Sequence, residues 1–76
     1  MADVTLDAKG LNCPLPILRA RKALKDVPPN GTLEILATDP GSLEDFAAFC
    51  RTTGNILAEQ SAHGGVYRFV IRRASD

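Results

Sequence analysis

Tryptophan is absent from this chain of 76 residues, and aromatic side chains make up only 5% of it. Proteins that bind single-stranded nucleic acid commonly stack the bases on exposed aromatic rings. Proteins that bind through phosphate contacts need a clear excess of Lys and Arg. Here nine basic residues balance nine acidic ones. Both shortages argue against direct binding of nucleic acid.

Long apolar runs and abundant cysteine are missing as well. No apolar run reaches the ~18 residues of a membrane span, and the first residues lack the basic-then-apolar order of a secretory signal. We therefore expect no membrane association and a cytoplasmic location. Two cysteines are too few for a disulfide scaffold, and a reducing cytosol keeps them as thiols. Their spacing from the one histidine matches no zinc motif, so we expect neither a metal nor a resident cofactor.

The length and composition predict one globular domain covering residues 1–76. Hydrophobic residues make up 45% of the chain and charged residues 24%, which is typical of a folded domain. A chain of this size buries only about 60% of the surface that its unfolded state exposes. Its stability is therefore modest, and we expect a monomer or a weak dimer.

The spacing of apolar residues predicts six elements in the order β-α-β-α-β-β. The predicted strands cover residues 4–8, 32–38, 56–61 and 66–72, and the predicted helices cover residues 14–26 and 42–53. Each β-α-β unit predicts parallel strands, and the last two strands predict a hairpin. Because each helix has a single apolar face, both are expected on one side of a four-stranded mixed sheet. The predicted fold class is thus an α/β (α+β) two-layer sandwich, with residues 74–76 as a tail.

The same periodicity predicts which side chains form the core. The helices contribute Ile17, Ala20, Leu24, Val27, Leu43, Phe46, Ala47 and Cys50, and the strands contribute Leu33, Ile35, Ala37, Tyr67, Phe69 and Ile71. The opposite face of the sheet carries Thr5, Asp7, Glu34, Arg68 and Arg72, and it is expected to face water. Cys50 is interpreted as a core residue, and His63 as part of the hairpin. Asp39, Ser42 and Asp45 are interpreted as turn and helix-capping residues.

Cys13 stands directly before Pro14 and Pro16, where the first helix begins. Proline suits a first helical turn because its φ is already helical and its missing N–H would have no partner there. At such a position, free backbone N–H groups and the helix dipole stabilise an anion and lower the pKa of a thiol. We therefore predict an exposed, nucleophilic Cys13 rather than a cysteine that packs as a small hydrophobe.

Three stretches carry a resemblance to a known family. Residues 6–16 include the motif Cys-Pro-x-Pro after a predicted strand and before a predicted helix, and residues 38–50 and 67–73 continue the match. Together they resemble the TusA/SirA-like sulfur-carrier family along nearly the whole chain. The short motif is specific when it lies between a predicted strand and a predicted helix, because the element order then also matches the fold of that family.

The resemblance implies a sulfurtransferase that acts as a protein-borne carrier. Members accept a sulfane sulfur as a persulfide on the motif cysteine, from a cysteine desulfurase or a rhodanese-like protein, and pass it to an acceptor protein. By this resemblance Cys13 is the catalytic residue, while Gly10, Asn12, Pro14 and Pro16 position it. Leu15 fills the variable position, where the best-known tRNA-thiolation members carry Glu. Relatives serve tRNA thiolation, molybdenum-cofactor assembly or the oxidation of reduced sulfur.

Two further interpretations accompany this one. A non-catalytic redox-sensing or regulatory binding module is the alternative function, in which Cys13 senses oxidation or merely packs. Arg19, Lys22 and Lys25 lie on the helix that Cys13 precedes, and we hypothesise that they dock acidic surfaces of donor or acceptor proteins.

Overall fold

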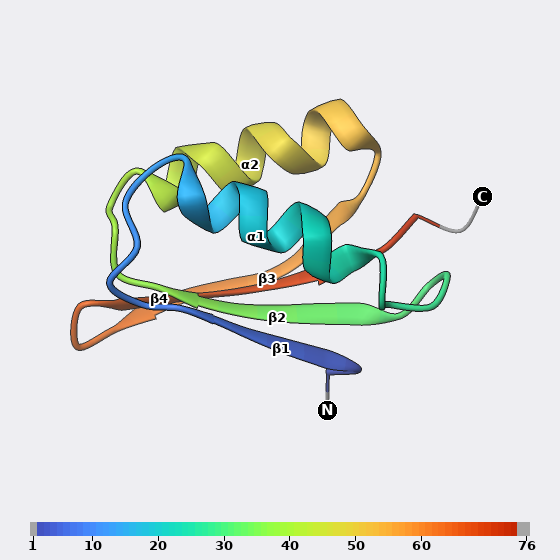
Figure 1. The fold of residues 1–76 in the computed structure, drawn as a ribbon, viewed down its shortest axis with the longest axis horizontal. Coiled ribbons are helices and arrows are strands. Elements are labelled where there is room, and N and C mark those ends of the chain that lie inside the picture. The colour runs from blue at the N-terminus through green and yellow to red at the C-terminus, as the bar shows by residue number, and fades with distance from the viewer. Residues whose placement is uncertain (1, 75–76) are drawn as a thin grey trace.

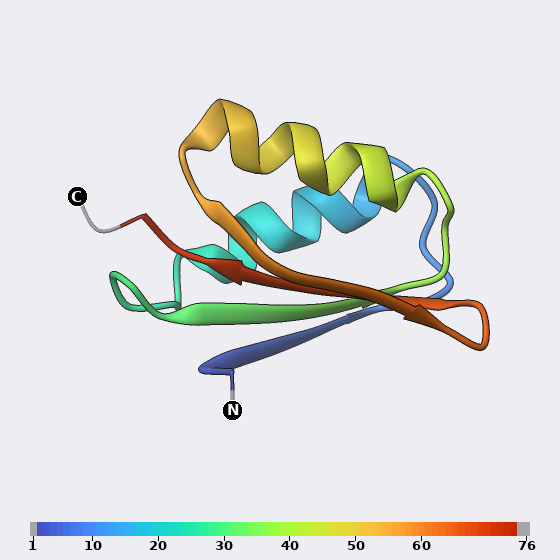
Figure 2. The ribbon, with the colours of Figure 1, turned by 180° about the vertical axis from the view of Figure 1, so that it is seen from behind.

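Six elements form two layers. The computed structural model describes residues 2–74. The elements are β1 (Val4–Ala8), α1 (Leu15–Leu24), β2 (Thr32–Ala37), α2 (Ser42–Thr53), β3 (Ile56–His63) and β4 (Val66–Arg72). Figure 1 shows α1 and α2 side by side over one face of the sheet, and the view from behind in Figure 2 agrees. The predicted two-layer sandwich is confirmed.

The sheet is mixed, with the strand order β1-β2-β4-β3. β1 pairs with β2 in parallel, whereas β4 is antiparallel to both β2 and β3. β2 and β3 therefore run in the same direction although β4 separates them. Because β1 and β2 are parallel neighbours, the loops that leave them toward α1 and α2 emerge at the same edge of the sheet. This edge carries the candidate site.

The core lies between the helices and the sheet, as the periodicity predicts. Its fully buried members include Ala20, Leu33, Ile35, Ala37, Phe46, Phe69 and Ile71. Tyr67 and Ile17 pack against this core but stay half-buried. Phe49, which the predicted apolar face of α2 omitted, is only 6% exposed. It is covered because it lines the interface with α1, where the Arg21 guanidinium lies 5.6 Å from the centre of its ring.

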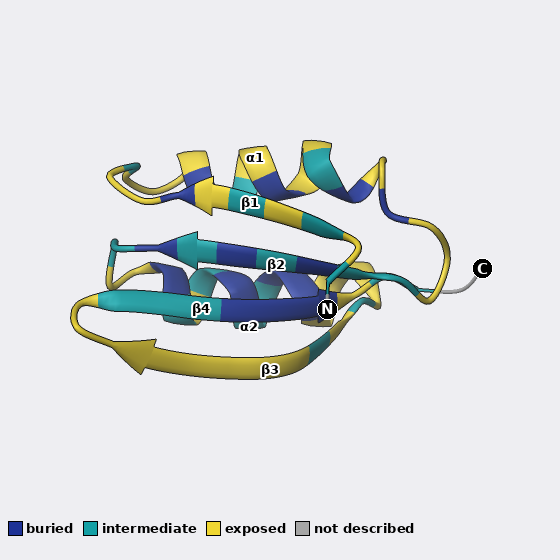
Figure 3. Ribbon diagram, turned by 90° about the horizontal axis from the view of Figure 1, so that it is seen from below, coloured by how far each residue is buried: buried dark blue, intermediate teal, exposed yellow. Residues whose placement is uncertain are grey.

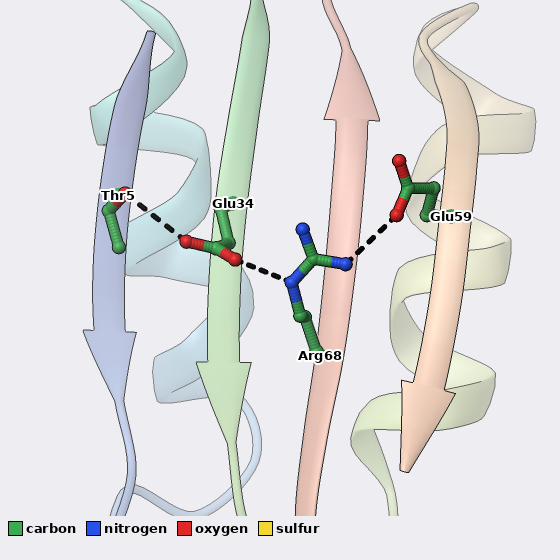
Figure 4. Close-up of polar contacts among 4 residues, drawn as sticks. All are labelled: Thr5, Glu34, Glu59 and Arg68. Atoms are coloured by element: carbon green, nitrogen blue, oxygen red, sulfur yellow. Dashed lines mark hydrogen bonds and ion pairs between the residues drawn. The ribbon is translucent and has the colours of Figure 1, made fainter. Parts of the chain in front are cut away.

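No helix covers the other face of the sheet (Figure 3), and polar side chains interact across it. Arg68 on β4 bridges two neighbouring strands, because its guanidinium pairs with Glu34 of β2 and with Glu59 of β3, the latter at 2.9 Å. The Thr5 hydroxyl donates to Glu34 from β1, so one polar chain crosses all four strands (Figure 4). Val70 on this face is nevertheless buried, since its strand is central.

Element ends differ from the predictions by a few residues. α1 ends at Leu24, and residues 25–27 continue as a tighter turn, whose N–H groups bond to carbonyls three residues earlier. β3 runs on to His63, past the predicted end at residue 61, because backbone pairing with β4 extends it to the turn. β3 is a mostly exposed edge strand with a register shift between Leu57 and Glu59. Because this strand has no buried face to fill, apolar and polar residues alternate only weakly along it.

Residues 75 and 76 of the predicted tail lie outside the described residues. Within residues 2–74, no helix is both long and apolar enough to cross a membrane.

Candidate functional site

Cys13 is exposed in the loop between β1 and α1. Backbone hydrogen bonds hold this loop: the Leu11 N–H donates to the Ala8 carbonyl at 3.2 Å, and the Leu15 N–H donates to the Asn12 carbonyl at 2.8 Å. Gly10 adopts a φ of 82°, a conformation that residues with a side chain disfavour. Its N–H donates to the Thr38 hydroxyl at 2.9 Å. The loop is therefore shaped by its backbone, and Asn12 contributes its carbonyl to that shape.

Asp39 ties the Cys13 loop to the loop that follows β2. One of its carboxylate oxygens accepts the Cys13 N–H at 2.8 Å, and the other accepts the Gly41 N–H at 3.3 Å. The two loops can meet because β1 and β2 are parallel neighbours. Asp39 thus does more than make the predicted turn: it fixes the backbone of Cys13 from a second element.

Pro14 and Pro16 form the start of α1, as predicted. Pro14 is the N-cap residue, its peptide bond to Cys13 is cis, and Pro16 lies within the first turn. Pro14 is exposed, whereas Pro16 is buried against the core. Both prolines lack an N–H, and the N–H groups of Cys13 and Leu15 already donate to Asp39 and Asn12. Four of the positions expected to supply amides for a thiolate at this helix end, residues 13–16, therefore have no N–H or one that is already bonded.

The expectation of a lowered pKa for Cys13 is accordingly wrong. The pKa of the Cys13 thiol lies above its ordinary value, chiefly because the thiol donates a hydrogen bond to the Asp45 carboxylate. Desolvation and the negative charges of Asp45 and Asp39 raise it further. Asp45 belongs to the first turn of α2, so this effect arises from the packing of one helix end against the other. The two carboxylates therefore favour the protonated thiol over the thiolate.

We expect Asp45→Asn to lower the pKa of Cys13 because it removes the nearest negative charge. The thiolate fraction at neutral pH then rises on the order of three- to tenfold. Iodoacetamide alkylation of Cys13 should accelerate by a similar factor, and the midpoint of its pH–rate curve should move to lower pH. Alkylation rates measured by intact mass across a pH series test this.

Glu44→Gln is the matched control, because Glu44 is an exposed acid in the same turn and does not contribute to the pKa of Cys13. An equal acceleration in both variants would show that net charge, rather than the contact with Asp45, governs the thiol.

A groove opens beside Cys13 between the two helices. It has a volume of about 300 Å³ and is lined by Cys13, Pro14, Ile17, Arg21, Asp45, Ala48, Phe49 and Thr52. Its floor is mainly apolar, with Asp45 near the Cys13 end and Arg21 further along α1. The Cys13 thiol therefore lies at the end of a groove and is not an isolated surface group.

Other residues interpreted from the sequence lie apart from this site. Cys50 is 6% exposed in the core, as predicted, and burial raises the pKa of its thiol. His63 ends β3 opposite Val66, within the hairpin, as predicted. The capping prediction for Ser42 is wrong: Gly41 is the N-cap of α2, and Ser42 lies within the first turn with its hydroxyl buried and unpartnered.

The basic side chains of α1 point outward. Arg19, Lys22 and Lys25 are all exposed, and the ion pairs found among residues 2–74 do not include them. Leu15 and Leu18 are 42% and 53% exposed on the same helix. The exposed surface of α1 therefore combines two leucines with basic residues.

Two residues of the site, Arg21 and Asp45, were not assigned to it from the sequence. Arg21 follows Pro14 by seven residues, which is two helical turns, so its place on the Cys13 side of α1 was in principle visible. Asp45 carried no such signal, because its proximity to Cys13 depends on how the two helices pack. Among residues 2–74, no group of three or more His, Cys, Asp or Glu side chains is arranged to hold a metal ion.

Comparison with known proteins agrees with this geometry. The family described as sulfurtransferase TusA matches residues 4–73. The sulfur carrier protein TusA of Allochromatium vinosum is 51% identical over 72 residues, covering 95% of each chain. The TusA of Pseudomonas aeruginosa is 40% identical over 74 residues, covering 97% of this chain and 94% of its own.

A solved structure has the same fold. The crystal structure of a SirA-like protein from Desulfitobacterium hafniense superposes with a TM-score of 0.81 at 27% sequence identity, covering 93% of this chain and 97% of the other. The two-layer fold and the match over residues 4–73 both place this chain in the TusA family of sulfurtransferases.

Proposed function

We propose that Cys13 accepts a sulfane sulfur as a persulfide and relays it to an acceptor protein. The observation that carries this proposal is an exposed thiol, anchored through its backbone to Asp39, at the end of a groove in a chain of the TusA family. The buried Cys50 offers no such access. The protein requires no resident cofactor, since the persulfide is transient.

The transfer conserves atoms and charge. The Cys13 thiol first gives up its proton to solvent. Its thiolate Sγ then attacks the outer sulfur of a donor persulfide; a new S–S bond forms, the donor's S–S bond breaks, and the donor leaves as a thiolate, which takes up a proton. An acceptor thiolate then attacks the outer sulfur on Cys13 in the same way, which regenerates the free cysteine. The donor is a cysteine desulfurase or a rhodanese-like protein. The acceptor serves tRNA thiolation, molybdenum-cofactor assembly or sulfur oxidation in the cytoplasm.

The raised pKa of Cys13 favours this relay over the alternative of a redox sensor. Redox-sensing cysteines are oxidised as exposed thiolates in the free protein, and the carboxylates near Cys13 oppose that ionisation. A docked partner that places a positive group or a hydrogen-bond donor at Asp45 removes the opposition. Cys13 then reacts mainly within complexes, as a carrier requires.

Loading of the purified protein tests the proposal. After incubation with a cysteine desulfurase and free cysteine, the intact mass should rise by about 32 Da, or one sulfur atom. Proteolysis without reductant should place the added sulfur on the peptide that contains Cys13. An unchanged mass, or sulfur found only on Cys50, would contradict the proposal.

The surface of α1 beside Cys13 is the proposed docking site for these proteins. Arg19, Lys22 and Lys25 attract an acidic partner, and the exposed Leu15 and Leu18 supply apolar contact. Opposite charges on the two surfaces mainly speed up encounter.

Reversing charge in the double variant Arg19→Glu, Lys22→Glu should slow sulfur loading from the desulfurase by about tenfold at low salt. The wild-type rate should fall as salt is raised, whereas the variant should lose this dependence. A double variant of equal charge, Arg51→Glu with Arg72→Glu, alters exposed residues of α2 and β4 and should behave like wild type. Equal slowing in both double variants would remove α1 as the docking surface.

A further inference from the structure

The groove beside Cys13 has two chemically different ends. Pro14, Ile17 and Arg21 follow one another along one side of α1, and the residues of α2 that face them run from Asp45 to Thr52. From Pro14 to Arg21 the helix rises about 10 Å. Cys13 and Asp45 therefore mark one end of a short channel, and Arg21 lies two turns further along.

Arg21 is placed to bind an anion. Its guanidinium lies 5.6 Å from the centre of the Phe49 ring, which holds the side chain over the groove. Arg21 lines the groove, and none of the ion pairs among residues 2–74 involves it, so its guanidinium has no carboxylate partner among these residues. Guanidinium groups bind carboxylates in a two-pronged geometry.

Asp45 acts in the opposite sense at the Cys13 end. Its carboxylate disfavours a second anion there, so a carboxylate of a ligand is favoured at Arg21 instead. Between the two charges the groove is apolar, with Ile17, Ala48 and Phe49 along it. This polarity favours a ligand that places its sulfur at Cys13 and a carboxylate at Arg21.

The size of the groove limits the ligand to a small molecule. Its volume of about 300 Å³ is at the lower end of the range for small-molecule pockets. An extended peptide of about three residues spans some 10 Å. A tripeptide thiol such as glutathione is within both limits; its sulfur is on the middle residue and it has a carboxylate at each end, one of which would lie at Arg21.

We propose that this groove binds the persulfide of a glutathione-type tripeptide thiol, with its sulfur at Cys13 and a carboxylate at Arg21, as a small-molecule sulfur donor. This rests on the proposed function of Cys13 as a persulfide carrier. The Cys13 thiolate attacks the outer sulfur of the tripeptide persulfide, a new S–S bond to Cys13 forms, and the tripeptide leaves as its thiol. One S–S bond forms and one breaks, so no oxidant or reductant is consumed.

The test compares two small donors on the same protein. Glutathione persulfide carries the carboxylate that Arg21 would hold, whereas inorganic polysulfide does not. Initial loading rates are measured by intact mass for the wild type, Arg21→Gln and Arg51→Gln. Arg51 is the matched control because it is an exposed arginine of α2 that does not line the groove. Perturbation of the NMR signals of Ala48 and Phe49 by S-methylglutathione, which cannot transfer sulfur, reports binding separately.

We expect Arg21→Gln to slow loading from glutathione persulfide about three- to tenfold, as loss of one partly exposed charged contact predicts. Loading from polysulfide should not change, Arg51→Gln should match the wild type, and the NMR perturbation should weaken in Arg21→Gln alone. Equal effects of Arg21→Gln on both donors, or on neither, overturn the inference. So does slower loading from a desulfurase alone, which would assign the groove to a protein segment. If a desulfurase loads the wild type but neither small donor does, the inference fails and the carrier function stands; if no donor of any kind loads it, the carrier function itself fails.

Discussion

Cys13→Ser is expected to abolish sulfur loading entirely, so that no species heavier by about 32 Da forms with any donor. A serine hydroxyl is not ionised at neutral pH, and its oxygen cannot hold a sulfane sulfur as a persulfide. The substitution changes a single exposed atom, and the contact that anchors residue 13 is made by its backbone N–H. The variant should therefore fold normally, and circular dichroism and thermal melting should confirm this.

Cys50→Ala is the control for this experiment. Alanine is preferable to serine at this position because Cys50 is buried in the core, where an unpaired hydroxyl is costly. The variant should load sulfur at the wild-type rate, although it should melt at a lower temperature. If Cys13→Ser still loads sulfur and loses this loading only when Cys50 is also replaced, then Cys50 and not Cys13 is the carrier residue.

Phe46→Ala is expected to cause the largest loss of stability. Phe46 and Phe69 are both fully buried, and their rings lie 4.8 Å apart between α2 and the sheet. Truncating a buried Phe costs about 3–5 kcal/mol in lost burial and cavity formation. A domain of this size has roughly 4–11 kcal/mol of unfolding free energy in total. The variant should therefore be partly unfolded at 37 °C, as urea titration followed by circular dichroism would show.

Ile56→Ala provides the comparison, because this similarly apolar residue is 56% exposed on the edge strand β3. It should change the unfolding free energy by less than about 0.5 kcal/mol. Phe46→Leu keeps most of the apolar volume and should lose an intermediate amount, which stays measurable if the alanine variant does not fold. A loss below about 1 kcal/mol for Phe46→Ala would mean that the core collapses around the gap.

Local patterns in the sequence account for most of the fold. The alternation of Leu33, Ile35 and Ala37 identified β2 and its buried face, and the predicted end of the second helix at residue 53 is confirmed, since Gly54 caps α2 with a φ of 78°. β3 was the weakest prediction, since an exposed edge strand has no apolar face to impose alternation. The hairpin with β4 determined its length instead.

The motif around Cys13 was equally visible, but its chemistry was not. The two prolines identified the helix start, and the exposure of Cys13 agreed with that position. The lowered pKa that this position implied was wrong, because the prediction considered α1 alone. Asp45, which raises the pKa, is 32 positions away in the chain and reaches Cys13 from another helix.

The sequence by itself determined the element order, the two-layer arrangement, the identity of the exposed cysteine and the family. These follow from periodicities of two and 3.6 residues and from a short contiguous motif, which depend on neighbours along the chain. Only the tertiary structure decided the ionisation of Cys13, the groove between the helices and the pairing of Arg21 with Phe49. These features depend on distances between residues on separate elements. The parallel pairing of β1 with β2 sets those distances, because it brings the starts of both helices together.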